Sequence, residues 1–377
     1  MTVQLTAAQV RRARWQSLGL GGEGILTVQG VVERLGALQG QDLPGVLISL
    51  ALRASRTTVH DTHRHFDEGA LVRGWPMRGT LHVLKAEDLL PMTQITQKRV
   101  LSGMAGQART LGITDSAIGR VIDVVADALR ESGPLSRAEL REIVARSYGG
   151  NPAREIISHL IYQLCTRGLI CHGPFRGDQQ LIVHTESWLG AHVAATPELD
   201  LDHFLVRMLK RYVAGHGPVS ESDAVRWFGL PLSIIREARL TLADQLVTVL
   251  TPGGAQWMTA SRETERILSA TSQRPRVRML PGFDEFMTGY ADRGFAVPAH
   301  AIDEIVPGKN GMFRPTVCSG ASVVGTWSKA TPHYTVHVQP FARLSAHTER
   351  GIHTAARELA RVTGKQVSVH LPISLKL

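Results

Sequence analysis

Cysteine is scarce in this sequence, with three residues in total, Cys165, Cys171 and Cys318. Three thiols are too few for a disulfide framework, and no Cys-x-x-Cys spacing suits zinc. Disulfide-rich secreted proteins and zinc-finger proteins are therefore excluded, and we expect all three thiols to be reduced and buried.

Long apolar runs are also lacking. No run approaches the ~20 residues that a membrane-spanning helix needs, and the polar start Met1-Thr2-Val3-Gln4 has no signal-peptide core. The sequence predicts a cytoplasmic protein that does not bind a membrane.

Aromatic residues make up only 5% of the chain, but 43% apolar and 20% charged residues are typical of a globular protein. A length of 377 residues is enough for two or three domains. The 42 basic residues exceed the 33 acidic ones and give a net charge of +9. This excess favours a nucleic acid as partner, because lysine and arginine displace counterions from phosphates.

Two glutamines, Gln39 and Gln41, lie between two apolar-periodic segments. The pattern predicts a short connector between two helices, in which Asp42 is an N-cap and Pro44 lies in the first turn of the second helix. Glutamines at helix junctions are usually solvated or bonded to the backbone, so the pair alone does not indicate chemistry.

The N-terminal part of the chain has the order of a winged helix-turn-helix. Thr6 and Gln9 form a capping box that predicts a helix to about Ser17, and the helices around the glutamines follow. Glycines and a proline in residues 71–84 then favour a β-hairpin. We assign this unit to residues 1–115.

A repeat occupies the middle of the chain. Gly133-Pro134-Leu135-Ser136 recurs 84 residues later as Gly217-Pro218-Val219-Ser220, and an acidic residue completes a capping box in each copy. Each copy follows one apolar-periodic helix and precedes two more helices and two short strands. This order predicts a second winged-helix unit over residues 116–195 and a third over residues 196–272.

Residues 273–377 have the strand-turn-strand pattern of a small β-rich lobe, with a helix expected at about residues 347–362. The predicted fold class is therefore α+β, with three tandem winged helix-turn-helix units and a β-rich C-terminal lobe. Such arrays are commonest in DNA-binding proteins, although winged helices also serve as structural scaffolds. The hairpins at residues 173–180 and 251–256 are either wings in a DNA groove or connectors.

Four stretches of the chain resemble the AlkZ-type tandem winged-helix DNA glycosylases. They are Leu-Gln-Gly-Gln-Asp at residues 38–42, Met-Arg-Gly-Thr-Leu-His at 77–82, Leu-Pro-Gly-Phe-Asp-Glu-Phe with Gly-Tyr-Ala-Asp-Arg at 280–293, and Asn-Gly-Met-Phe-Arg-Pro-Thr with Val-Val-Gly-Thr-Trp at 310–327. The resemblance implies an enzyme that removes alkylated purines and unhooks interstrand crosslinks, with close relatives that confer antibiotic self-resistance of the azinomycin type.

The family's catalytic motif is a glutamine, an aliphatic residue and a second glutamine, or aspartate in a sister branch. The resemblance places its outer positions on Gln39 and Gln41, while Gly40 departs from the aliphatic middle. Glutamine at position 41 points to the crosslink-unhooking branch. Asn310, in the last of the four stretches, is expected to support the site.

Two amides suit the hydrolysis of one kind of N-glycosidic bond. The reaction passes through an oxocarbenium-like sugar and needs a placed water and a good leaving group. Glutamine is not a base near neutral pH, but its carbonyl accepts and its NH2 donates hydrogen bonds, so two amides can fix a water. An N7-alkylated purine is already cationic and departs as a neutral base.

We therefore expect a monofunctional DNA glycosylase that acts on double-stranded DNA carrying alkylated or crosslinked purines. It should act as a monomer in the bacterial cytoplasm, at the nucleoid, with no metal and no cofactor. A crosslinked base cannot flip freely, which favours an open basic cleft over a deep pocket.

Asp284 and Glu285 either polarise the water or pair with arginines, for which Arg293 and Arg278 are the expected partners; the structural interpretation is favoured. Arg78 either contacts a phosphate or holds Asp284.

Arginines that alternate along an expected strand are the main phosphate candidates. The full set of expected DNA contacts is Arg274, Arg276, Arg278, Arg314 and Lys329. The cluster of His60, His63 and His65 lacks a fourth metal ligand and is expected to be a solvated loop. Arg11, Arg12 and Arg14 are expected to be a solvated helix face, with contact to the DNA backbone as the alternative.

The rival interpretation is a non-enzymatic winged-helix DNA-binding protein or transcriptional regulator. Such a regulator should tolerate alanine at Gln39 and Gln41, whereas a glycosylase should keep DNA binding and lose chemistry. A structural scaffold predicts no salt-dependent DNA binding at all.

Overall fold

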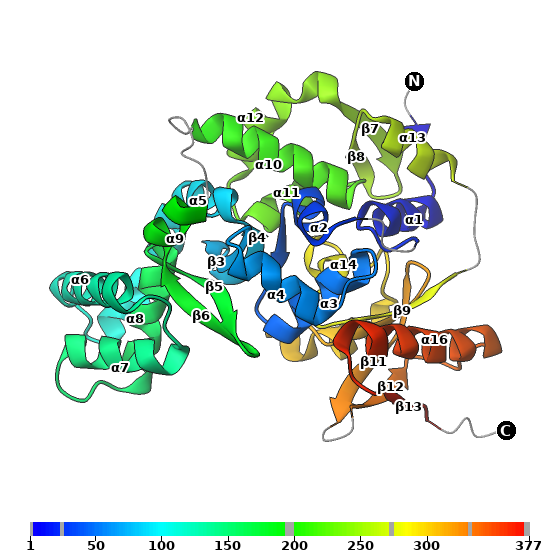
Figure 1. Ribbon diagram of the computed structural model, residues 1–377. Coiled ribbons are helices and arrows are strands. Elements are labelled where there is room, and N and C mark those ends of the chain that lie inside the picture. The colour runs from blue at the N-terminus through cyan, green and yellow to red at the C-terminus, as the bar shows by residue number, and fades with distance from the viewer. Residues whose placement is uncertain (1–2, 23–25, 193–199, 271–274, 331–333, 373–377) are drawn as a thin grey trace. The chain divides into compact units, whose positions relative to one another are not determined.

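The computed structural model describes residues 3–22, 26–192, 200–270, 275–330 and 334–372. These fall into two compact units, one formed by residues 1–62 with 206–377 and the other by residues 63–205 (Figure 1). Both units combine helices with strands, so the predicted α+β class is confirmed. The expected N-terminal segment 1–115 is divided between the two units.

The first unit contains both ends of the chain. Its elements are β1 (Val3–Gln4), α1 (Ala7–Ser17), α2 (Val28–Leu35), β2 (Ala37–Gln39), α3 (Leu43–Arg53), α11 (Glu221–Phe228), α12 (Leu232–Thr241), η1 (Ala243–Gln245), β7 (Leu246–Thr251), β8 (Gly254–Thr259), α13 (Arg262–Ser269), β9 (Val277–Leu280), α14 (Glu285–Thr288), η2 (Ala299–Ala301), α15 (Ile302–Ile305), η3 (Pro307–Lys309), β10 (Thr316–Ser319), β11 (Ser322–Ala330), β12 (Thr335–Pro340), α16 (Ala346–Thr363) and β13 (Ser368–His370).

The second unit is an uninterrupted stretch of chain. Its elements are β3 (Leu71–Met77), β4 (Thr80–Lys85), α5 (Ala86–Thr110), α6 (Asp115–Ser132), α7 (Arg137–Tyr148), α8 (Arg154–Thr166), β5 (Ile170–Arg176), β6 (Gln179–His184) and α9 (Thr185–His192). Helices α4 (Val59–Asp67) and α10 (Leu201–His216) each cross the division between the units.

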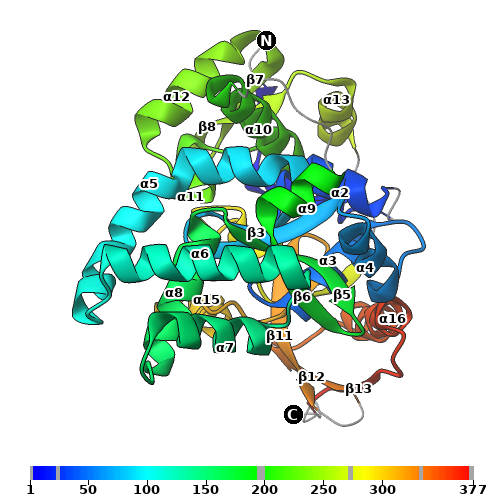
Figure 2. The ribbon, with the colours of Figure 1, turned by 60° about the vertical axis from the view of Figure 1, so that its left-hand side comes forward.

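The two copies of the repeat have the predicted element order. One copy is α6, α7, α8, β5 and β6 (Figure 2), the other is α10, α11, α12, β7 and β8, and both α7 and α11 begin with the predicted capping box. In each copy the residue before the capping serine bridges to the second strand of the hairpin, Leu135 to Ile182 and Val219 to Trp257. The local sequence rules therefore specify this supersecondary unit twice.

Apolar residues at helical spacing explain why the first copy folds. Val121, Val125 and Leu129 lie on one face of α6 and are buried against Leu160 and Leu164 of α8. Such an apolar stripe removes its surface from water only when another element covers it.

The β-hairpin predicted at residues 71–84 is confirmed as β3 and β4. Arg78 and Gly79 have positive φ values of 56° and 67°. This is the backbone conformation of a two-residue turn that suits twisted strands. Strand β3 also pairs with β5, so the hairpins of the second unit form one antiparallel sheet in the order β4-β3-β5-β6.

The connector expected around the glutamines is partly a strand. Gly36 ends α2 with φ 78°, and the chain then forms β2, in which Ala37 and Leu38 are each 1% exposed. Asp42 occupies the N-cap position of α3 and Pro44 lies in its first turn, as predicted, but the Asp42 side chain forms no cap hydrogen bond.

The C-terminal lobe is a five-stranded sheet in the order β13-β12-β11-β10-β9, with α16 packed across β9 and β10 (Figure 1). The helix predicted at residues 347–362 is confirmed as α16. A Cβ atom at Gly351 would lie 2.3 Å from the side chain of Val277, so glycine lets this helix approach the sheet closely.

The three cysteines are free and buried, as predicted. Burial raises the pKa of Cys171 to about 12. Across the described parts of the chain, no helix combines the length and apolarity needed to cross a bilayer.

Candidate active site

The two glutamines lie where solvent reaches them. Gln39 is half-buried at the end of β2, and Gln41 is exposed immediately before the N-cap of α3. Strand β2 leads into the motif and helix α3 follows it, so regular secondary structure fixes the backbone on both sides of the two glutamines.

Three of the four stretches that carry the family resemblance meet at this motif. A Cβ atom at Gly45 would lie 2.6 Å from Oδ2 of Asp42 and 3.3 Å from the carbonyl oxygen of Gly282. A Cβ atom at Gly282 would lie 2.6 Å from the carbonyl oxygen of Phe313. A separation of 2.6 Å is too short for a Cβ atom, so the backbones at Gly282 and Phe313 approach each other closely, and Gly282 in turn lies beside Gly45 at the start of α3.

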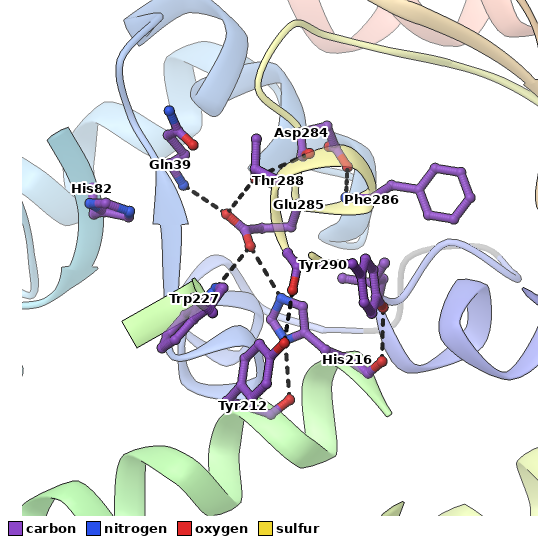
Figure 3. A network of polar contacts seen from close by, with 12 residues as sticks. Gln39, His82, Tyr212, His216, Trp227, Asp284, Glu285, Phe286, Thr288 and Tyr290 are labelled. Atoms are coloured by element: carbon purple, nitrogen blue, oxygen red, sulfur yellow. Dashed lines mark hydrogen bonds and ion pairs between the residues drawn. The ribbon is translucent and has the colours of Figure 1, made fainter. Parts of the chain in front are cut away.

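The carboxylate of Glu285 is held by four donor groups at this junction (Figure 3). Its Oε1 accepts hydrogen bonds from the backbone N–H of Gln39 at 2.9 Å and from the hydroxyl of Thr288 at 3.2 Å. Its Oε2 accepts from the indole N–H of Trp227 at 3.1 Å and lies 3.2 Å from Nε2 of His216. The residue is 1% exposed, so these contacts replace water as the partners of a buried charge.

His216 is fully buried beside Glu285. Its Nδ1 lies 3.1 Å from the carbonyl oxygen of Tyr212, and its Nε2 faces the Glu285 carboxylate, so each ring nitrogen has an oxygen atom as its neighbour. The hydroxyl of Tyr290 donates to the His216 carbonyl at 2.8 Å. Burial raises the pKa values of Tyr212 and Tyr290, which keeps both phenols protonated as donors.

Sequence reasoning did not single out His216 and Trp227. Both lie outside the four stretches of family resemblance, in the second copy of the repeat, where helix spacing predicts core positions. The one available signal was a histidine directly before the repeated Gly-Pro pair, and it does not identify a partner.

Asp284 has a different partner from those expected. Its two oxygens receive two N–H bonds from the guanidinium of Arg53, both at 2.8 Å, and Oδ2 also accepts from the Ser49 hydroxyl at 2.7 Å. The same carboxylate caps α14 through the N–H of Phe286 at 3.0 Å. Asp284 therefore ties α14 to the C-terminal end of α3.

For Asp284 the expected pairing with Arg293 or Arg278 is thus wrong, because Arg53 is its partner. Arg293 donates to the carbonyl oxygen of Met287 at 2.9 Å and lies 4.9 Å from the ring of Phe313. One of the two alternatives for Arg78 was that it holds Asp284. Arg53 holds Asp284 instead.

The phosphate role expected for Arg278 is also wrong. Its guanidinium lies 2.8 Å from Oε1 of Glu358 and donates to the carbonyl oxygens of Leu20 and Gly22. At 1% exposure it is out of reach of a phosphate, and burial lowers its pKa. Arg276 shares the same carboxylate at 3.2 Å but keeps 38% of its side chain exposed. The third arginine of this strand pattern, Arg274, lies outside the described residues.

Arg14 is not on a solvated helix face. It is 3% exposed, donates to Asp223 at 3.1 Å and to the carbonyl oxygen of Pro218 at 2.9 Å, and lies 4.2 Å from the ring centre of Tyr290. The guanidinium therefore joins α1 to the second copy of the repeat.

Among the remaining expected DNA contacts, Lys329 and Arg314 are exposed. The ammonium of Lys329 lies 4.9 Å from the ring of Tyr334. Burial, together with the negative charge of Asp42, raises the pKa of Tyr334. Arg314 lies 3.9 Å from Oε2 of Glu304.

The two remaining candidates have local partners. Asn310 is exposed, and its Oδ1 accepts from the N–H of Met312 at 2.9 Å, which closes a turn. In the second unit, Nη2 of Arg78 lies 2.8 Å from Nε2 of His82.

The histidines expected in a solvated loop lie instead on α4. His63 is 7% exposed and stacks on Phe175, with ring centres 3.8 Å apart and planes 3° from parallel. Within the described ranges, no group of three or more His, Cys, Asp or Glu side chains is arranged to hold a metal ion.

The family described as DNA glycosylase AlkZ-like matches residues 32–362. The chain belongs to this family. It is 26% identical over 341 residues to the interstrand DNA cross-link repair glycosylase of Streptomyces sahachiroi, across 89% of this chain and 90% of that protein. The solved structure of the Streptomyces sahachiroi DNA glycosylase AlkZ superposes with a TM-score of 0.78 and 22% identity, across 98% of this chain and 100% of that one.

These similarities confirm the family resemblance of the four stretches. Membership of the AlkZ-like family makes the protein an enzyme of the DNA glycosylase class. The structural match shows that the described fold is the AlkZ fold.

Proposed function

We propose that this AlkZ-like protein is a monofunctional DNA glycosylase that hydrolyses the N-glycosidic bond of N7-alkylated purines, with Gln39 and Gln41 positioning the water. The observation that carries the proposal is the placement of the two amides. They lie two positions apart on a solvent-accessible junction, and a buried carboxylate holds the backbone of the first.

The chemistry of glutamine selects the substrate. An amide orients a water through its carbonyl and NH2 groups but removes no proton at neutral pH. The leaving group must therefore depart without an acid, as a cationic N7-alkylpurine does when it leaves as a neutral base. A water nucleophile also gives hydrolysis in one step, without a covalent enzyme intermediate.

We further propose that the substrate includes crosslinked purines in double-stranded DNA. The relative from Streptomyces sahachiroi is named an interstrand DNA cross-link repair glycosylase. The second glutamine of the motif is present in this chain as Gln41. We interpret the helix-helix-hairpin units as three tandem winged helices that act on DNA as a monomer, associated with the bacterial nucleoid.

Four basic residues remain as proposed phosphate contacts. Lys329, Arg314 and Arg276 expose side-chain area in the first unit, and Arg78 occupies the hairpin turn of the second. Lys329 and Arg314 are the more exposed of the three in the first unit, whereas Arg276 shares the carboxylate of Glu358.

The first experiment measures release of 7-methylguanine from methylated duplex DNA, with abasic sites detected by alkaline cleavage. We expect release by the wild type and none above background by Gln39→Ala/Gln41→Ala, while fluorescence anisotropy gives the same DNA affinity for both. Loss of binding in the variant would instead assign the glutamines to DNA contact.

Unchanged release by the variant would refute the role of the two amides. Absence of release by both proteins from methylated and from crosslinked duplexes would refute the proposed substrate class. Single-turnover conditions, with enzyme in excess over DNA, separate bond cleavage from product release.

A further inference from the structure

We infer that Glu285 is a positioning residue for Gln39, with His216 and Trp227 fixing its carboxylate from the opposite side. This inference rests on the proposed catalytic role of Gln39. Glu285 itself does not touch the substrate, because its 1% exposure leaves the carboxylate inside the protein.

The two carboxylate oxygens of Glu285 contact different parts of the protein. Oε1 faces the glutamine motif and accepts hydrogen bonds from the Gln39 backbone and from Thr288. Oε2 faces the core and contacts Trp227 and His216. Because each oxygen already has two partners, the carboxylate has little capacity left to bind or deprotonate a water.

The contact between Glu285 and the backbone N–H of Gln39 affects the position of the Gln39 side-chain amide. Strand β2 is three residues long, and Gln39 is its last residue. A bond from an N–H to an ionised carboxylate is stronger than one to a neutral carbonyl. Fixing this N–H limits rotation about the N–Cα bond of Gln39 and so limits the directions in which the side chain leaves the strand.

The core side of the carboxylate is itself rigid. His216 is held between Glu285 and the carbonyl oxygen of Tyr212, and its ring stacks on the Tyr212 ring with centres 4.6 Å apart. A Cβ atom at Gly289 would lie 2.6 Å from Cδ2 of His216, so α14 reaches the imidazole closely only because glycine stands there. The carboxylate is thereby fixed independently of the motif.

Glu285→Gln is the variant that tests this role. A carboxamide has one acceptor oxygen, so it cannot serve the donors of Gln39 and Thr288 together with those of Trp227 and His216. Its NH2 group must face hydrogen-bond donors on one of the two sides. The volume of the side chain is unchanged, which separates the loss of the contact from the loss of packing.

The experiment measures the single-turnover excision rate of 7-methylguanine at saturating enzyme, the DNA dissociation constant and the melting temperature for each variant. We expect Glu285→Gln to lower the excision rate about tenfold or more, the equivalent of one hydrogen bond to a charged group, with DNA affinity within about twofold of wild type. Trp227→Phe removes one of the four donors and should give a smaller loss in the same parameter.

Glu358→Gln is the matched control. It makes the same chemical change to a largely buried carboxylate of the same unit, which lies on α16 and holds Arg276 and Arg278. It should lower the melting temperature without slowing excision. A wild-type excision rate for Glu285→Gln, or an equal rate loss for Glu358→Gln, would overturn the positioning role. Wild-type excision by Gln39→Ala/Gln41→Ala would instead overturn the proposed function together with this inference.

Discussion

Removing the carboxylate of Asp284 is expected to destabilise the first unit strongly. In Asp284→Ala the guanidinium of Arg53 loses its two 2.8 Å bonds to the carboxylate, and the donors of Ser49 and Phe286 lose their acceptor. The two side chains of the ion pair are 1% and 0% exposed, so water does not replace the missing partner.

The magnitude follows from this burial. Removal of one partner of a buried ion pair costs about 3–5 kcal/mol, a large part of the ~5–15 kcal/mol that stabilises a typical domain. For a unit of this size, each kcal/mol lowers the melting temperature by about 2–4 °C. We therefore expect Asp284→Ala to melt about 6–20 °C below the wild type.

Thermal unfolding followed by circular dichroism measures the shift. Glu221→Ala is the control, because it removes a bidentate carboxylate–guanidinium pair with Arg236 that is exposed to solvent. Exposed pairs contribute little, so the control should melt close to the wild type.

A second variant tests the physical cause. Asp284→Ala/Arg53→Met removes the orphaned charge as well, so it should melt above Asp284→Ala despite carrying two substitutions. The reasoning is refuted if Asp284→Ala shifts the melting temperature no more than Glu221→Ala does, or if the double variant is less stable than Asp284→Ala.

Two further predictions concern packing and thiol chemistry. Gly282→Ala should lower the free energy of unfolding in urea by about 1–3 kcal/mol, because its Cβ atom would lie 2.6 Å from the Phe313 carbonyl oxygen. Gly119→Ala in α6 is the control. A Cβ atom there would meet no atom within 4 Å, so this substitution should be neutral or stabilising. Burial raises the pKa of Cys171 to about 12, so its reactive thiolate is suppressed at pH 8 in the folded protein and should form there only on unfolding. Mass spectrometry after iodoacetamide treatment should find Cys171 modified in urea but not in the native protein, and rapid native modification would contradict its buried position.

Local rules explain which parts of the fold could be predicted. Capping boxes depend on residues three positions apart, and the repeated Gly-Pro pair with its capping serine marks the same junction twice, so α1, α7 and α11 begin at the expected residues. The Arg78–Gly79 turn follows from a glycine that tolerates positive φ. None of these features needs knowledge of distant contacts.

The side of α1 that faces the core could also have been predicted. Val10, Ala13, Arg14 and Ser17 are all buried and share one face at helical spacing. Arg14 therefore lies on the apolar stripe, whereas the count of three nearby arginines favoured a solvated face. The same spacing on α4 buries Thr62, His63 and Phe66, although its histidine content favoured a loop.

The partners within the candidate site could not be predicted, because they depend on long-range contacts. Gln39 and Glu285 are 246 positions apart, and Arg53 and Asp284 are 231 positions apart. Sequence spacing indicated that Asp284 and Glu285 are acidic neighbours near arginines, but it could not choose Arg53 over Arg278 or Arg293. The choice is made by the contact of α3 with the turn before α14, which brings Arg53 and Ser49 to Asp284.

The adjacent carboxylates of Asp284 and Glu285 hold the glutamine motif from both sides. Glu285 bonds to the backbone of Gln39, the last residue of β2 and the first glutamine of the motif, and Asp284 bonds to the last turn of α3, which follows the motif. Phe283 directly precedes them with a positive φ of 61°, an unfavourable conformation for a non-glycine residue that the surrounding contacts must maintain. Because one short turn anchors both elements that flank Gln39 and Gln41, a change in that turn should move both amides together, whereas a change in either anchor alone should move only one.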